Sequence, residues 1–61
     1  MCEFKVILDG KLVFEDAIYA RDDGDKVMVK DVLGNWKEFR NCKIIEVNVN
    51  SERLILSTQV E

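Results

Sequence analysis

The chain has 61 residues, with nine Lys and Arg against twelve Asp and Glu, a net charge of −3 and no histidine. This balance opposes simple binding to phosphate, which depends on clustered positive charge, and the lack of histidine excludes Ser-His-Asp and Cys-His nucleophiles and His-containing metal sites. A chain this short forms one domain, residues 1–61, that is marginally stable alone, so we expect a partner subunit to help stabilise it.

The first third of the chain predicts two strands joined by a tight turn. Residues 2–8 place apolar side chains at even positions, as in a strand with one face inward. Asp9-Gly10 is a strong hairpin signal because both positions tolerate positive φ, and residues 11–16 follow as the second strand. Residues 17–20 could continue this strand after a bulge or form one helical turn. We favour a bent strand, because the segment is too short for a stable helix.

The middle of the chain predicts an exposed acidic turn and a second hairpin. Residues 22–25 are read as a solvated loop, since an EF-hand loop needs more positions and a closing glutamate at the twelfth. Residues 26–32 form the third strand and residues 36–40 the fourth, with Gly34-Asn35 as the expected tip of the turn between them.

The last third predicts two more strands, residues 44–50 and 53–57, which gives six short strands in a chain without proline. Alternation in the fifth strand places Ile45, Val47 and Val49 inward. The pattern therefore predicts an all-β fold, a small antiparallel barrel of about six strands of the SH3-like or Sm-like kind, whose closure removes edges that invite aggregation. The predicted core consists of Val6, Phe14, Val29, Val47 and Leu56.

The start of the chain carries candidate metal chemistry. The Cys2 thiolate, the Cys2 backbone nitrogen and the α-amine at Met1 can close fused chelate rings on one ion. Nitrogen and thiolate in a plane suit Ni(II) or Cu(II) better than Mg or Ca. The amine and the thiol have unperturbed pKa values of about 8 and 8.5, so both can lose protons to a metal near neutral pH. Alternatively, Cys2 is an inert apolar residue of the first strand.

The remaining chemistry is limited. Cys42 could complete a metal site with Cys2 or fill space after the fourth strand. Two cysteines forty positions apart do not make a disulfide framework, so both are expected to be reduced thiols in a cytoplasmic protein. There is neither a signal peptide nor an apolar run of about 20 residues, so no membrane association is expected. The carboxylates fall in turns, without the shielded cleft that catalysis requires, so we do not expect an enzyme.

A basic patch near the fourth strand raises an alternative function. Lys37, Arg40 and Lys43 cluster around this strand and could form a local patch. RNA bases would need exposed aromatic side chains beside a basic groove to stack on, and Tyr19 and Trp36 are the candidates. The three basic residues could equally be a solvated strand face balanced by Glu38. A small RNA-binding module of the Sm-like type is therefore the alternative, although the negative net charge argues against nucleic acid as a partner.

The opening Met1-Cys2, followed by Phe4, Val6 and Leu8, resembles the start of the CooT family of very small nickel-binding proteins. The likeness covers nearly the whole chain, through Asp22-Asp23-Gly24-Asp25, Asp31-Val32-Leu33-Gly34, Ile44-Ile45-Glu46-Val47 and Arg53-Leu54-Ile55-Leu56. It implies a homodimeric β-barrel that binds Ni(II) through Cys2 near the dimer interface, as a metallochaperone for a nickel enzyme, carbon monoxide dehydrogenase, or its maturation factors. The family has also been labelled as predicted RNA-binding proteins.

Overall fold

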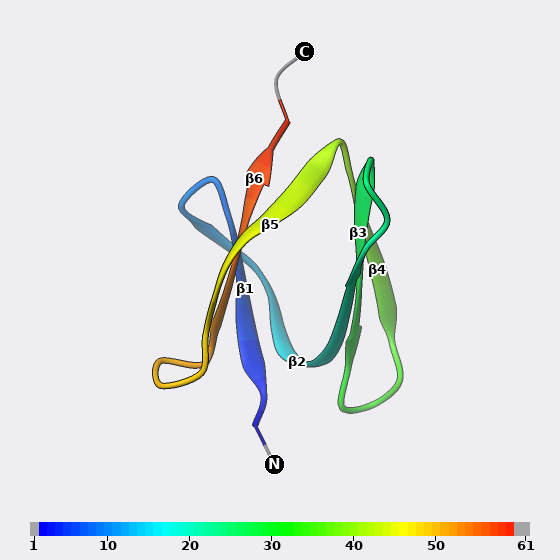
Figure 1. The fold of residues 1–61 in the computed structure, drawn as a ribbon. Helices are drawn as coiled ribbons and strands as arrows, with labels where there is room; N and C mark the ends of the chain where they lie inside the picture. The colour runs from blue at the N-terminus through cyan, green and yellow to red at the C-terminus, as the bar shows by residue number, and fades with distance from the viewer. Residues whose placement is uncertain (1, 60–61) are drawn as a thin grey trace.

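The computed structural model describes residues 2–59, which form six strands in one sheet (Figure 1). The strands are β1 Phe4–Leu8, β2 Lys11–Asp22, β3 Lys26–Asp31, β4 Trp36–Arg40, β5 Cys42–Asn48 and β6 Arg53–Thr58. Their order across the sheet is β4-β3-β2-β1-β6-β5. The predicted all-β class and six strands are confirmed. The sheet is mixed rather than antiparallel, because β1 and β6 run parallel.

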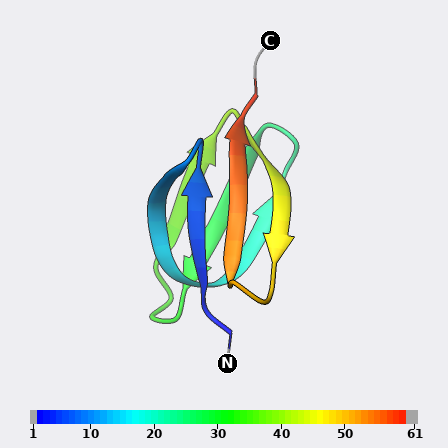
Figure 2. The ribbon, with the colours of Figure 1, turned by 90° about the vertical axis from the view of Figure 1, so that its left-hand side faces the viewer.

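The sheet folds over itself because β2 bends. Figure 2 shows β1, β6 and β5 in one layer and β3 and β4 behind them, with β2 passing from the first layer to the second. Phe4 pairs with Ala17 and Val6 with Phe14, so β2 holds one more residue than β1 between these pairs. Asp16 lies in this interval with a positive φ of 59°, the geometry of a bulge that bends a strand. The predicted bent strand is confirmed, and no helical turn forms over residues 17–20.

The two layers enclose a small apolar core. The predicted core positions Val6, Val29 and Leu56 are almost fully inaccessible to solvent, at 0%, 0% and 1% exposure. Phe14 is partly buried and packs against these residues. The other buried side chains are Ala17, Val27, Phe39, Cys42 and Leu54.

Val47 is not a core residue, and its prediction is wrong. Its side chain is 57% exposed, and those of Ile45 and Val49 are 55% and 61% exposed. Ile44 pairs with Leu56 and Glu46 with Ile55, so Ile45 is an extra residue that breaks the alternation of β5. Val47 itself pairs with the buried Leu54 and faces the same side of the sheet, but β5 is an edge strand, so no further strand of residues 2–59 shields it there.

The predicted closure into a barrel is also wrong. Among residues 2–59, the edge strands β4 and β5 each pair with one neighbour only, so the sheet stays open. A single residue, Asn41, connects them, and its positive φ of 59° makes a sharp corner. The corner sends β5 across to β6 instead of alongside β4 (Figure 1).

The hairpin turns show where the sequence signals succeed and fail. Asp9 and Gly10 have φ of 50° and 86°, as the predicted primed turn requires. In the turn between β3 and β4, however, the tip is Val32-Leu33 rather than Gly34-Asn35. The Asp31 carboxylate accepts the Leu33 amide at 2.9 Å, and Gly34 takes the positive φ, 89°, that closes a three-residue loop.

The burial of the two leucines Leu56 and Leu33 predicts different costs for truncating their side chains. Leu56→Ala should lower the free energy of unfolding by about 3 kcal/mol, because it opens a cavity in a fully packed site. Leu33→Ala is the matched control. Its side chain is 83% exposed, so the change should stay within about 0.5 kcal/mol. Urea unfolding followed by the fluorescence of the single tryptophan measures both, and equal costs would contradict this description of the core.

Candidate metal centre

Cys2 lies at the start of the sheet with its donor atoms outside the strand ladder. The residue is exposed and is separated from β1 by one residue, Glu3. A backbone hydrogen bond ties β1 to the turn before β6 later in the chain, from the Lys5 amide to the Glu52 carbonyl at 2.8 Å. The Cys2 thiol and backbone nitrogen therefore precede the paired part of the strand. Met1, the other predicted ligand, lies outside the described residues.

Cys42 lies at the opposite end of the sheet. It pairs with Thr58, whereas Lys5 pairs with Arg53, and β1 and β6 are parallel. The length of β6, about 17 Å at strand spacing, therefore separates the levels of the two cysteines. The Cys42 thiol is buried and donates to the Arg40 carbonyl at 3.2 Å. The structure thus assigns Cys42 to space filling and does not bring it to Cys2.

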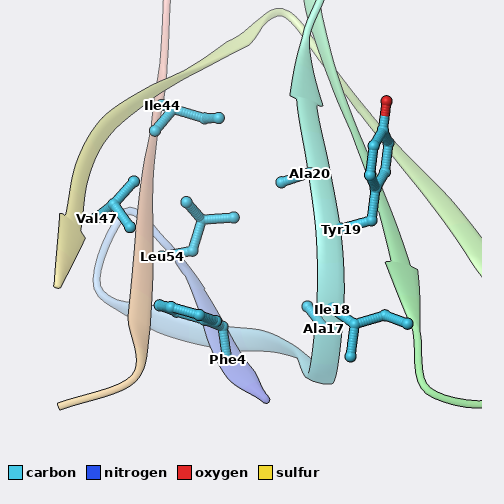
Figure 3. A pocket seen from close by; sticks show the side chains of 8 residues that line it. All are labelled: Phe4, Ala17, Ile18, Tyr19, Ala20, Ile44, Val47 and Leu54. Carbon is cyan, nitrogen blue, oxygen red and sulfur yellow. The ribbon is translucent and has the colours of Figure 1, made fainter. Parts of the chain in front are cut away.

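An apolar groove lies between the two layers at the open seam of the sheet. It has a volume of about 200 Å³. Figure 3 shows the Ile44 and Leu54 side chains reaching from β5 and β6 toward β2, where the facing residues are the small Ala17 and Ala20. The other lining residues are Phe4, Ile18, Tyr19 and Val47.

The rim of this groove near Cys2 is apolar and exposed. Val47 lies near the end of β5 and Val49 in the turn that leads to β6, and they are 57% and 61% exposed. Ile18 is 42% exposed and follows Ala17, which pairs with Phe4, and its side chain points away from Val47 in Figure 3. We call Ile18, Val47 and Val49 the apolar rim. Their positions along the strands place the rim at the end of the sheet where the chain begins, the end that carries Cys2 (Figure 1).

The other end of the seam is tied by polar groups. The Asp22 carboxylate accepts the Gly24 amide at 2.8 Å and the Ile44 amide of β5 at 3.1 Å. These two backbone hydrogen bonds lower the pKa of Asp22 below its usual 3.8. The Gln59 side chain donates to the carbonyls of Gly24 at 2.7 Å and Cys42 at 3.1 Å. The acidic turn therefore fastens β2 to β5, and it is the loop that the sequence predicts.

Two other carboxylates hold turns in the same way. Asp9 accepts the Thr58 hydroxyl at 2.5 Å and the Thr58 amide at 3.1 Å, and these bonds lower its pKa. The pKa of Asp31 is lowered chiefly by the Asn35 amide, at 2.9 Å. Within residues 2–59, no three His, Cys, Asp or Glu side chains gather closely enough to hold a metal ion. No helix in this range is long and apolar enough to cross a bilayer.

The predicted basic patch does not assemble. Lys37 and Arg40 lie on opposite faces of β4, since Lys37 stacks over the Phe39 ring, whose side chain belongs to the core, and Arg40 pairs with Glu38. Instead, the strand register brings Lys30 of β3 beside Trp36, a pairing that the sequence pattern does not predict. Only the pairing of β3 with β4 reveals it.

A comparison with known families agrees with the sequence resemblance. The family model described as CO dehydrogenase accessory protein CooT matches residues 1–57, which include Cys2 and nearly all of the sheet. The chain belongs to the CooT family. CooT proteins are accessory proteins of carbon monoxide dehydrogenase rather than its catalytic subunits, and the chain has this accessory role by membership.

A curated relative of this CooT chain is the uncharacterized protein MJ1551 of Methanocaldococcus jannaschii. The two are 39% identical over 51 residues, which is 82% of this chain and 90% of the relative. Nearly the whole small domain is therefore shared between the two proteins.

The lowered carboxylate pKa values predict acid-sensitive stability. A carboxylate whose pKa is lower in the folded than in the unfolded state stabilises the fold above the unfolded value, about 3.8 for Asp22, and this contribution is lost as pH falls through the folded pKa. Asp22→Asn should therefore be less stable than the parent at pH 7, with the difference shrinking below pH 4. Asp25→Asn makes the same charge change in the same turn and should show little difference. Urea midpoints measured from pH 2.5 to 7 test this pH dependence. A loss of stability in Asp22→Asn that stays constant over this range would contradict it.

Proposed function

We propose that the chain is a dimeric, cytoplasmic metal-binding protein that holds Ni(II) through Cys2 for the maturation of carbon monoxide dehydrogenase. The observation that supports this most is the position of Cys2, which is exposed, precedes the ladder and lies at the end of the sheet that carries the apolar rim. Family membership supplies the link to the enzyme.

The donor set at Cys2 fits nickel. A soft thiolate with adjacent backbone nitrogen favours late divalent metals in planar geometry. One Cys2 supplies a sulfur and a backbone nitrogen, so two copies fill four positions, and the predicted amine at Met1 would add a further nitrogen. The expected stoichiometry is one ion per dimer. Because the thiol is exposed, ligands of a receiving enzyme can reach the ion without unfolding of the domain.

The apolar rim supports a dimer that would bring two Cys2 residues together. In a two-fold dimer the same patch meets itself, so residues close to the axis lie close to their own copies. Contact through Ile18, Val47 and Val49 would cover side chains that the single chain leaves 42%, 57% and 61% exposed. It would also supply the stabilisation that a chain of this length needs.

Cysteine variants test the metal site. Cys2→Ser removes the soft ligand with little change in size, so calorimetry should find tight nickel binding abolished. Cys42→Ser is the matched control and should bind nickel as the parent does. Affinity in the parent should fall as pH drops, because protons compete for sulfur and nitrogen. Parental affinity in Cys2→Ser, or loss in Cys42→Ser, would place the site elsewhere.

A charge in the apolar rim tests the dimer. Val47→Asp should give a folded monomer at micromolar concentration, because Val47 is exposed in the single chain while two facing carboxylates would repel each other across the axis. The control is Leu12→Asp. Leu12 is 49% exposed but lies near the Asp9-Gly10 turn, at the other end of the sheet, so this variant should remain a dimer. Sedimentation of both variants measures their oligomeric state, and an intact Val47→Asp dimer would rule out this interface.

A further inference from the structure

The outward side of β2, β3 and β4 is a second candidate binding surface, separate from β1, the strand that follows Cys2. Side chains of paired antiparallel residues point to the same side of a sheet. Tyr19 pairs with Lys30 and Lys30 with Trp36, so these three form one row across the three strands. Their neighbours along β3, Val27 and Val29, are buried, so the row faces outward. We call the side of these strands that carries this row the outer face.

The row is a cluster of aromatic rings around a cation. The Tyr19 and Trp36 rings meet edge to face, with centroids 5.6 Å apart and planes at 77°. The Lys30 ammonium lies 5.9 Å from the Tyr19 centroid and 5.3 Å from the Trp36 centroid. Tyr19 and Trp36 nevertheless remain 41% and 52% exposed. Rings that already pack against each other lose less conformational freedom when a partner covers them than rings that extend separately into solvent.

The charge of the outer face is opposite to that of the chain. It holds four of the nine basic residues of the chain, Arg21, Lys26, Lys30 and Arg40, against two acidic side chains, Glu38 and the Asp23 that pairs with Arg21. Arg21 pairs with Asp23 at 2.9 Å and Arg40 with Glu38 at 2.7 Å. No carboxylate of residues 2–59 lies within salt-bridge distance of Lys26 or Lys30. A local positive surface on a chain of net charge −3 is a site for an anionic partner.

The geometry favours a protein segment over single-stranded nucleic acid. Nucleobases stack on open ring faces, but here the rings meet edge to face and the Lys30 ammonium already lies over both. The net charge of −3 also repels a long polyanion, whereas it matters less for a short segment. Trp, Tyr, Met and Arg are the side chains enriched at protein interfaces, and Met28 lies between Arg21 and Glu38 in the next row.

We propose that the outer face of β2–β4 docks an acidic segment of a partner protein. Three strands span about 10 Å and the length of β3 about 17 Å, which matches one extended segment of about five residues. Carboxylates of the segment would meet Lys26 and Lys30, and an apolar side chain between them would pack on Trp36. This inference rests on the proposed function only in that an accessory protein must meet another protein, since the outer face includes neither Cys2 nor the apolar rim.

The test uses the full chain and a synthetic hexapeptide with a central Leu-Phe pair flanked by two glutamates on each side. The chain has one tryptophan, so quenching or shift of Trp36 fluorescence reports occupancy of the outer face. Saturable binding is expected that weakens as salt increases, and the peptide with glutamines in place of glutamates should bind at least about tenfold more weakly. Equal binding of both peptides, or no saturation with the acidic one at millimolar concentration, overturns the proposal.

Charge-reversal variants locate the binding. Lys26→Glu and Lys30→Glu should each weaken the acidic peptide about tenfold or more, whereas Lys43→Glu, an equal charge change on β5, should remain within about twofold. Lys26→Glu remains informative if Lys30→Glu fails to fold. Equal losses of peptide affinity in all three variants would show that the peptide does not bind at the outer face. Tighter binding of a twelve-nucleotide oligouridylate than of the peptide would overturn the proposal and assign the face to nucleic acid. Lys26→Glu should keep nickel binding and Cys2→Ser should keep peptide binding, so failure of one proposal is distinguishable from failure of the other.

Discussion

The bend in β2 is the constraint on which the fold depends. The positive φ of Asp16 turns its carbonyl out of the ladder with β1. The carbonyl instead accepts the amide of Val32, just after β3, at 3.0 Å. The next residue, Ala17, then pairs with Phe4 of one layer and Asp31 of the other, and it is 2% exposed. One strand thus serves both layers, and a methyl side chain at the crossing lets them approach closely. Without this bend, one face of a flat sheet would have no apolar layer to cover it.

The sequence predicted strands well because alternation and turn chemistry are local properties. The Asp9-Gly10 turn and the bent β2 follow from such signals. Barrel closure failed because it depends on where the chain travels after the corner at Asn41, which no periodicity encodes. The core prediction for Val47 failed for a related reason. Alternation places Val47 on the same face as the buried Leu54, but it does not reveal that β5 is an edge strand on which that face stays open.

The candidate sites also differ in whether they depend on adjacent residues or on pairing between distant strands. Cys2 could be proposed from the sequence because a thiol next to backbone and terminal nitrogen is a local chelate, and its exposure fits that proposal. The separation of Cys42 from Cys2 depends on the parallel pairing of β1 with β6, strands at opposite ends of the chain. Lys30 beside Trp36 likewise requires the register between strands. Chemistry that depends on adjacent residues can be predicted from the sequence, whereas the spatial neighbours of a residue depend on pairing between distant strands.

The seam between β5 and β2 is fastened unequally, and this has a dynamic consequence. The Ile44 amide donates to the Asp22 carboxylate, whereas Val47 faces an open groove. Local opening of a folded domain begins where few apolar contacts and hydrogen bonds oppose it. The last residues of β5 should therefore exchange their amide hydrogens at lower free energy than the segment around Ile44. Cys2 lies at that looser end, so a metal site of the kind proposed there would have donor atoms free to adjust while the core around Val6 and Leu56 stays closed.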